Sequence, residues 1–220
     1  MKKIFAINGS PRANSNSGLL LDSFLNGATK SHAGITQYRT NELNIKNCTG
    51  CLRCNLIKRC SLRDDDWEKI SHEMQASDVI VFASPVYFHH FPAGVKTIID
   101  RFRSFINVQI TEESIIHTPW HEWKKDFVLL LSMGSSDPVD AKPIIELFEF
   151  MIEVLGPESR LHVIAGTRLA VSRQITMTRE ELEVLYPKLQ IPVELAEKDA
   201  AVNKQILTTA NELGAQLAEL

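Results

Sequence analysis

The four cysteines of the chain gather in one short segment with the spacing Cys48-x2-Cys51-x2-Cys54-x5-Cys60. A compact triplet of thiols with a fourth nearby resembles iron–sulfur spacing, whereas structural zinc more often takes two C-x2-C pairs that stand further apart. Cations that would offset thiolate charge surround the segment: Lys46, Arg53, Lys58, Arg59 and Arg63. The spacing favours a 4Fe–4S cluster, with zinc, or four reduced thiols without a metal, as the alternatives.

A polar loop near the N-terminus has the composition of a phosphate site. It runs Asn8-Gly9-Ser10-Pro11-Arg12-Ala13-Asn14-Ser15-Asn16-Ser17, between an apolar run and a helical pattern. A helix N-terminus offers free N–H groups and a positive dipole end. Side chains that would add donors or charge are Ser10, Arg12, Ser15, Asn16 and Ser17. The loop matches neither the Walker nor the G-x-G-x-x-G pattern, and the alternative is a polar turn with a Ser or Asn helix cap.

A second motif, Ser84-Pro85-Val86-Tyr87-Phe88, directly follows another apolar run. A planar heteroaromatic ligand needs an apolar face to lie on and N–H donors for its ring carbonyls and nitrogens, and this segment supplies both. The alternative is a turn with buried aromatic side chains. His89 and His90 come next; they are either contacts for a substrate or redox partner, or ordinary loop residues.

Short apolar runs alternate with amphipathic stretches, and this alternation predicts an α/β fold with a parallel sheet that positions the motifs. The predicted strands are Lys3–Ile7, Ile35–Leu43, Val79–Ala83, Phe127–Ser132 and Leu161–Ala165. The predicted helices are Asn16–Thr29, Asp65–Gln75, Pro92–Phe105, Ala141–Leu155, Arg179–Tyr186 and Val193–Leu220. The third strand is continuously apolar, as expected of a strand that is covered on both faces.

Several segments carry no clear chemical signal. Ile106–Lys125 is irregular by pattern and is a candidate for shaping a pocket or an oligomer contact, with Trp120 and Trp123 interpreted as packing residues. Asp64-Asp65-Asp66 precedes a predicted helix, where acidic side chains complement the helix dipole. Asp100-Arg101 is interpreted as a structural pair or as surface charge.

Composition excludes some classes of function. The chain of 220 residues is 44% hydrophobic and 23% charged, with a formal net charge of −3, so no basic excess favours nucleic acid or an anionic membrane. Its apolar runs are far shorter than the ~20 residues that cross a bilayer, and Ile4–Ile7 after Lys2 and Lys3 is too short for a secretory signal. We expect a cytoplasmic protein whose cysteines are thiols or metal ligands rather than disulfides.

Together, the three motifs resemble those of the NADPH-dependent FMN reductase family and, more narrowly, its iron–sulfur flavoprotein branch. The N-terminal G-S-P-R-x-x-S-N-S is similar to the FMN-phosphate loop of the family. Ser84-Pro85-Val86-Tyr87-Phe88, with Lys96 and Ile99-Asp100-Arg101, resembles its S-P-V-Y…K…I-D-R flavin segment. The stretch Cys48–Cys60, followed by Asp64-Asp65, resembles the cysteine loop of the branch. The resemblance covers about residues 3–135.

The resemblance implies a flavodoxin-like three-layer sandwich, with a five-stranded parallel sheet in the order 2-1-3-4-5 and helices on both faces. We expect one FMN-binding domain over residues 1–220, with a cysteine-rich loop at 47–63 and a C-terminal helical tail at 167–220. The implied phosphate contacts are Ser10, Arg12, Ser15, Asn16 and Ser17. The implied ring contacts are Pro85, Val86, Tyr87 and Phe88, with Ser132, Met133 and Gly134 in a second loop at the ring edge.

The implied function is that of an FMN-dependent oxidoreductase. NAD(P)H would reduce FMN, electrons would pass to a small-molecule or protein acceptor, and a cluster on Cys48, Cys51, Cys54 and Cys60 would relay single electrons. No catalytic side chain is expected, because the flavin carries the chemistry. The alternatives are an electron-transfer flavoprotein between ferredoxin-like partners without NAD(P)H turnover, and a quinone or nitroaromatic reductase without a cluster. The resemblance also implies a homodimer or homotetramer.

Overall fold

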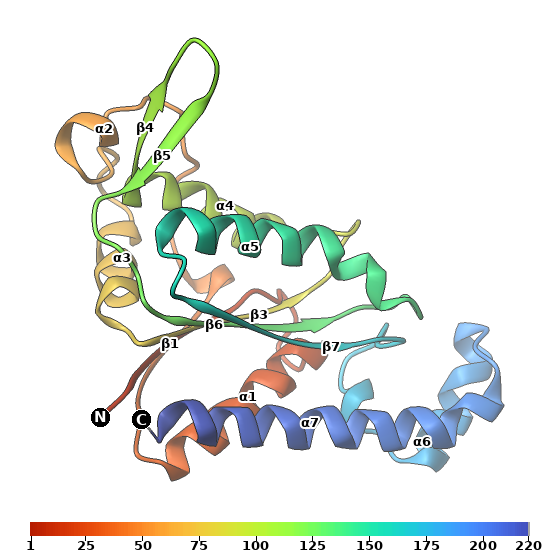
Figure 1. Ribbon diagram of the computed structural model, residues 1–220. Coiled ribbons are helices and arrows are strands. Elements are labelled where there is room, and N and C mark those ends of the chain that lie inside the picture. Colours follow the sequence, from red (N-terminus) through yellow and green to blue (C-terminus); the bar gives the residue numbers. More distant parts are fainter. Residues whose placement is uncertain (220) are drawn as a thin grey trace.

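The computed structural model describes residues 1–219, and a five-stranded parallel sheet forms its centre (Figure 1). The spatial order is β2-β1-β3-β6-β7, and all neighbouring strands are parallel. The strands are β1 (Lys3–Asn8), β2 (Gly34–Arg39), β3 (Val79–Pro85), β6 (Asp126–Ser132) and β7 (Arg160–Gly166). Numbered within this sheet alone, the strands follow the order 2-1-3-4-5, so the predicted flavodoxin-like topology is confirmed.

Helices cover both faces of the sheet (Figure 1). One face carries α1 (Asn16–Lys30) and α7 (Ala196–Ala218), and the other carries α3 (Trp67–Ala76), α4 (Ala93–Arg101) and α5 (Lys142–Leu155). Two short helices, α2 (Cys54–Ile57) and α6 (Arg179–Leu185), lie in the cysteine segment and the C-terminal segment. The predicted last helix extended to Leu220, a residue outside those described.

The strand sequences explain the two apolar layers, because successive side chains of a strand point to opposite faces of the sheet. In β3, Ile80 and Phe82 belong to the core under α3, α4 and α5. Val79 and Val81 belong to the core under α1 and α7. All four are at most 1% exposed, and this double burial explains why the strand is apolar throughout.

Helices α1 and α7 pack with almost no space between their backbones. A Cβ atom on Gly27 would lie 1.9 Å from the carbonyl oxygen of Asn211, and one on Gly214 would lie 2.0 Å from that of Phe24. Ser23 Oγ also donates to the carbonyl of Leu207 at 2.7 Å. The C-terminal helix is therefore fixed against the N-terminal one, which carries the polar loop at its start.

Two sequence-based expectations are wrong. The segment Ile106–Lys125, predicted to be irregular, contains the antiparallel hairpin of β4 (Ile106–Ile110) and β5 (Ile115–Pro119), which projects beyond the helix layer of α4 and α5 (Figure 1). Its alternation of isoleucine or valine with polar residues was the available signal. The second strand ends at Arg39 rather than Leu43, because Thr40–Glu42 turns into a short 3-10 helix.

No helix within residues 1–219 combines the length and the apolar character needed to span a bilayer.

A buried polar network ties the C-terminal segment together. Asp199 is 4% exposed and accepts hydrogen bonds from Arg168 Nε at 2.7 Å and from the Tyr186 hydroxyl at 2.6 Å. Burial alone would raise the pKa of Asp199, but the hydrogen bonds from Arg168 and Tyr186 outweigh it and hold that pKa below its usual range. Burial and the neighbouring carboxylate raise the pKa of Tyr186, which therefore stays a donor.

Replacing Asp199 with asparagine should lower the free energy of unfolding by about 3 kcal/mol, because Arg168 would lose the partner of a largely buried ion pair. Thermal unfolding at pH 7 should then show a Tm about 6–12 °C lower. The pKa of this carboxyl is lowered by folding, so its contribution is present above about pH 4 and fades as pH falls through the folded-state value. The Tm difference from wild type should shrink in acid. The exposed Glu197→Gln change is the control and should lower the free energy of unfolding by less than about 1 kcal/mol. An unchanged Tm for Asp199→Asn at pH 7 would contradict a stabilising role for the Asp199–Arg168 pair.

Candidate functional site

The polar loop and the aromatic motif meet at one cavity of about 260 Å³. It lies at the carboxyl ends of the adjacent strands β1, β3 and β6, where ligands bind in open α/β sheets. The lining residues are Ser10, Arg12, Ser15, Asn16, Pro85, Val86, Tyr87, Ser132, Gly134, Leu169 and Ala170. Topology thus brings together segments that lie far apart in the sequence.

Local hydrogen bonds shape the loop after β1. Gly9 N–H donates to the carbonyl of Ala83 at 2.7 Å, which fastens the loop to the end of β3. Asn8 Oδ1 accepts from Ser10 N–H at 3.1 Å, and Ser10 Oγ accepts from Arg12 N–H at 3.2 Å. The loop is therefore curved by its own side chains before the helix begins.

The start of α1 presents unpartnered donors. Ser15 is the N-cap residue, and its Oγ accepts from Gly18 N–H at 3.0 Å. The N–H groups of Asn16 and Ser17 make no hydrogen bond within residues 1–219, as is usual for a first helical turn. Ser17 Oγ is buried and also lacks a partner among the described residues. A buried hydroxyl without a partner is costly. The unpartnered N–H of Asn16, a residue that lines the cavity, suits an anionic oxygen at this helix N-terminus.

Two of the predicted phosphate contacts have structural roles. The side-chain amide of Asn16 donates to the carbonyls of Leu169 and Val171 at 3.2 and 2.8 Å, and its oxygen accepts from Ile175 N–H at 3.0 Å. Arg12 Nη1 donates to the carbonyl of Ala170 at 3.0 Å. These contacts hold a C-terminal segment as a wall of the cavity, and no local sequence pattern pointed to that segment.

A further cation lies beside the polar loop. Arg39, at the end of β2, donates through Nη2 to the carbonyls of Arg12 and Ser10 at 3.2 and 3.5 Å. Sequence reasoning missed this residue because the second strand was expected to continue past it.

The aromatic motif forms a tight turn. Tyr87 and His90 exchange backbone hydrogen bonds of 2.8 and 3.0 Å, and between them Phe88 and His89 take φ values of 49° and 60°. Positive φ at both central residues is characteristic of a type I′ turn. Tyr87 lines the cavity, whereas the side chain of Phe88 is fully exposed and does not. His89 instead faces Asp140, with 3.4 Å between Nδ1 and Oδ1.

Three of the predicted flavin contacts do not line the cavity. Phe88 is at the exposed tip of the turn, and Ser17 is buried behind the loop. Met133 is 3% exposed in the apolar core, although its neighbours Ser132 and Gly134 do line the cavity. The backbone of Met133 bonds to Gly166 and Leu169 rather than facing the opening.

The four cysteines border a second, much smaller cavity of about 20 Å³. Cys54 is buried at the start of α2, and Arg103 Nη1 lies 3.4 Å from its sulfur. Within the described part of the chain, no three histidine, cysteine or acidic side chains stand close enough to hold a metal ion. The four cysteines therefore border one cavity without forming a ligand set for a metal ion in the described residues.

The cysteine side chains differ in acidity. The hydroxyl of Ser61, together with the backbone near Arg53, lowers the pKa of the Cys51 thiol to about 7. Burial raises the pKa of Cys54 despite the positive charge of Arg103. Only the thiolate form binds metal.

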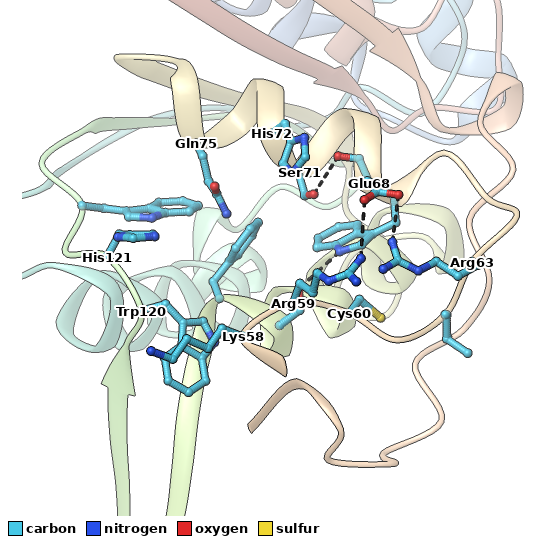
Figure 2. Close-up of a pocket in the computed structure, with 15 residues that line it drawn as sticks. Lys58, Arg59, Cys60, Arg63, Glu68, Ser71, His72, Gln75, Trp120 and His121 are labelled. Carbon is cyan, nitrogen blue, oxygen red and sulfur yellow. Dashed lines mark hydrogen bonds and ion pairs between the residues drawn. The ribbon is translucent and has the colours of Figure 1, made fainter. Parts of the chain in front are cut away.

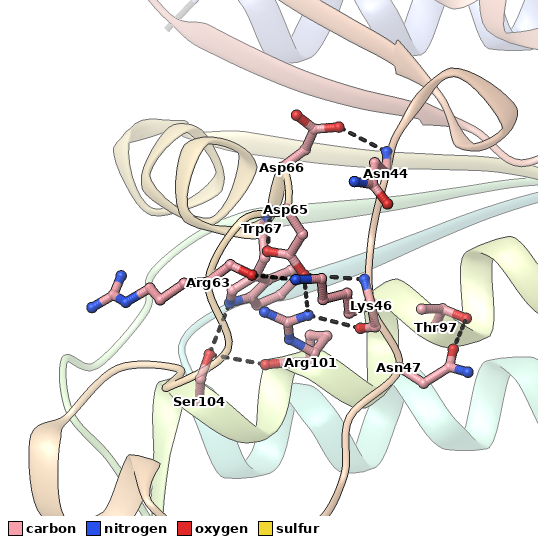
Figure 3. A network of polar contacts seen from close by, with 10 residues as sticks. All are labelled: Asn44, Lys46, Asn47, Arg63, Asp65, Asp66, Trp67, Thr97, Arg101 and Ser104. Carbon is pink, nitrogen blue, oxygen red and sulfur yellow. Dashed lines mark hydrogen bonds and ion pairs between the residues drawn. The ribbon is translucent and has the colours of Figure 1, made fainter.

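A buried ion pair anchors this segment (Figure 3). Arg101 Nη1 donates to Asp65 Oδ2 at 2.6 Å and to the carbonyl of Lys46 at 2.7 Å, and both charged side chains are at most 1% exposed. Hydrogen bonds from Arg101 and from Lys46 N–H outweigh the effect of burial and lower the pKa of Asp65. The expected Asp100–Arg101 pair is wrong, since Asp100 pairs with Lys96 and Arg101 is buried; the alternative of a surface charge holds for Asp100, which is exposed.

The guanidinium of Arg101 also supplies a test of whether an anionic group fits here. Its Nε and Nη2 atoms are buried without a partner in the described residues, and the side chain lines the cysteine cavity. The charge of Arg101 is balanced by Asp65, so these two atoms lack hydrogen-bond acceptors rather than a counter-charge. The sulfur atoms of a cluster with thiolate ligands accept hydrogen bonds, so the donor set fits a cluster in its chemistry.

The fold and the first cavity define a flavodoxin-like α/β protein with a nucleotide-type crevice at the carboxyl ends of its strands. The model of one protein family, described as NADPH-dependent FMN reductase, matches residues 2–154. The chain belongs to this family.

Curated relatives are named iron–sulfur flavoproteins. The protein of Archaeoglobus fulgidus is 34% identical over 99 residues, which cover 45% of this chain and 44% of that protein. The protein of Methanosarcina thermophila is 34% identical over 100 residues, which cover 45% of this chain and 51% of that protein. The chain thus spans about half the length of these relatives.

Solved structures extend the likeness over nearly the whole chain. An FMN-dependent NADH-azoreductase from Bacillus anthracis in complex with FMN has a TM-score of 0.65 at 12% identity, and the match covers 99% of this chain and 100% of that one. An NAD(P)H:quinone oxidoreductase from Methanothermobacter marburgensis has a TM-score of 0.63 at 12% identity, with coverages of 98% and 96%. At such identities the likeness shows the fold alone.

Proposed function

We propose that the protein is an FMN-dependent oxidoreductase that takes electrons from NAD(P)H and delivers them to a small-molecule or protein acceptor. The observation that carries this proposal is the convergence of the helix N-terminus and the aromatic turn on one cavity. Membership of the FMN reductase family supports it. Bound FMN would supply hydride acceptance and electron release, so the protein contributes binding and positioning.

Different residues would bind the phosphate and the ring system of FMN. The N–H group of Asn16 would hold the phosphate together with the hydroxyls of Ser10 and Ser15, because all three residues line the cavity and this N–H lacks a partner within residues 1–219. Arg12 and Arg39 add positive charge beside that loop. Five other lining residues would border the ring system: Pro85, Val86, Tyr87, Ser132 and Gly134.

We further propose that Cys48, Cys51, Cys54 and Cys60 bind a 4Fe–4S cluster. All four border one cavity beside the unpartnered guanidinium atoms of Arg101. The names of the curated relatives support this proposal. When bound, the cluster would accept or donate single electrons, and Arg101 Nε and Nη2 would donate hydrogen bonds to its sulfur atoms.

We also propose a homodimer or homotetramer. The β4–β5 hairpin exposes Ile110, Ile115 and Ile116, and an exposed apolar patch is typical of a protein–protein interaction site. We propose that a second copy of the chain covers these exposed isoleucines. Sedimentation equilibrium measures the mass of the assembly.

The proposed function is tested by anaerobic purification, followed by absorption spectroscopy, metal analysis and assays of NADPH and NADH oxidation. We expect bindable FMN, about four irons per chain and sustained NAD(P)H oxidation with an added acceptor. Failure to bind FMN would overturn the proposal. Reduction by ferredoxin without NAD(P)H turnover would identify an electron-transfer flavoprotein instead. Flavin with NAD(P)H turnover but without iron would identify a quinone or nitroaromatic reductase.

A further inference from the structure

A third cavity, of about 220 Å³, lies on the other side of the cysteine segment (Figure 2). It is enclosed by α3, by residues 58–63 and by the chain that follows β5. All three tryptophans of the protein line it: Trp67, Trp120 and Trp123. Apart from Cys60, which borders both this cavity and the smaller one, none of the residues proposed to bind FMN or a cluster takes part.

The base of this aromatic cavity is rigid and apolar. Trp67, Phe105 and Trp123 are each at most 4% exposed. Their rings are in contact, with centroid distances of 5.6 Å between Trp67 and Phe105 and 5.0 Å between Phe105 and Trp123. Flat aromatic surfaces of this kind bind planar rings by stacking or edge contacts.

The rim is positively charged. Arg59 and Arg63 both form ion pairs with Glu68, at nitrogen–oxygen distances of 3.8 and 2.8 Å. One carboxylate therefore balances the charge of only one of the two guanidinium groups. Lys58 has no carboxylate within 4.0 Å among residues 1–219. Three cations against one anion leave an excess of positive charge at the opening.

An unpartnered donor completes the arrangement. Trp120 Nε1 is buried and makes no hydrogen bond within the described chain, and Lys58 Nζ lies 5.6 Å from the centroid of the same indole ring. Figure 2 shows Lys58 against Trp120 on one side of the cavity and Gln75 pointing in from the opposite side. The indole N–H needs an acceptor and the ammonium needs a counter-charge, and one anionic oxygen group would serve both.

We propose that this aromatic cavity binds a small aromatic carboxylate of one or two rings. The ring would lie on the aromatic base, and the carboxylate would face Lys58 and Trp120 Nε1. The volume is below the range of ~300–1,000 Å³ that takes drug-sized ligands, which restricts the ligand to a small one. The site is separate from the proposed FMN site, and its occupancy requires neither flavin nor cluster.

The test uses isothermal titration calorimetry of the purified full-length protein, with 1-naphthoate as the probe and its uncharged analogue 1-naphthamide as the comparison. We expect one naphthoate per chain and an affinity at least about tenfold higher than for naphthamide, equivalent to about 1.4 kcal/mol. Lys58→Gln should weaken naphthoate binding about fivefold to tenfold and naphthamide binding less than twofold. The matched control Lys188→Gln, at an exposed position away from the cavity, should change neither.

A second measurement locates the probe. The protein labelled with ¹⁵N at tryptophan gives three indole N–H resonances, and Trp120→Phe identifies the one that belongs to Trp120. We expect naphthoate to shift that resonance most strongly. Equal affinities for the acid and the amide, or Lys58→Gln binding like wild type, would overturn the proposal. So would binding that changes flavin absorbance and leaves the indole resonances unmoved.

Discussion

Replacing Ser15 with aspartate is expected to weaken FMN binding by at least about a hundredfold, whereas replacing it with asparagine should cost less than about fivefold. Ser15 lines the cavity and caps α1 through its side chain. Asparagine and aspartate are both good N-caps, so neither change should disturb the fold. They differ in one charge, and that charge would face a phosphate carrying −1.5 to −2. At about 4–6 Å and an effective dielectric constant of about 20, the repulsion is about 4–8 kcal/mol, which exceeds the ~2.7 kcal/mol that a hundredfold loss of affinity requires.

The measurement is quenching of FMN fluorescence on titration with flavin-free protein. Riboflavin, which lacks the phosphate, provides the internal control and should bind Ser15→Asp and Ser15→Asn equally. Circular dichroism and thermal unfolding should show both variants folded as wild type. Equal FMN affinity for the two variants would mean that the phosphate lies elsewhere, and the proposed FMN site would have to be abandoned.

Replacing Cys54 with serine is expected to reduce the iron content from about four per chain to below about one. Serine nearly keeps the shape of cysteine, but its hydroxyl does not ionise near neutral pH and cannot replace a thiolate ligand. Because Cys54 is not among the residues that line the FMN cavity, the variant should still bind FMN. Flavin absorbance would remain after the broad absorption of the cluster has gone.

Iron and sulfide analysis after anaerobic reconstitution measures the effect. Ser114→Ala is the control, because it removes an exposed hydroxyl in the β4–β5 turn, away from the cysteine cavity; its iron content should equal that of wild type. Undiminished iron in Cys54→Ser, or zinc in the wild-type protein, would contradict the cluster proposal.

The sequence alone determined the layered α/β architecture and most of its elements. Continuous apolar runs such as Val79–Ala83 identified buried strands, and helical periodicity located the helices between them. These elements can be predicted because the hydrophobic periodicity within a single strand or helix indicates its type and its buried face. The family was also accessible, since its motifs are short, contiguous and ordered along the chain.

Only the tertiary structure shows which hydrogen-bond or ion-pair partner each side chain has. Asn16 holds Leu169 and Val171 across more than 150 positions, and Arg101 is buried against Asp65 rather than its neighbour Asp100. The same folding gathers three tryptophans and a lysine into the aromatic cavity. A residue's local pattern indicates whether its side chain faces the core or solvent. The identity of the group it meets depends on how separate elements pack, and that information resides in the contacts between elements rather than in the pattern of any one of them.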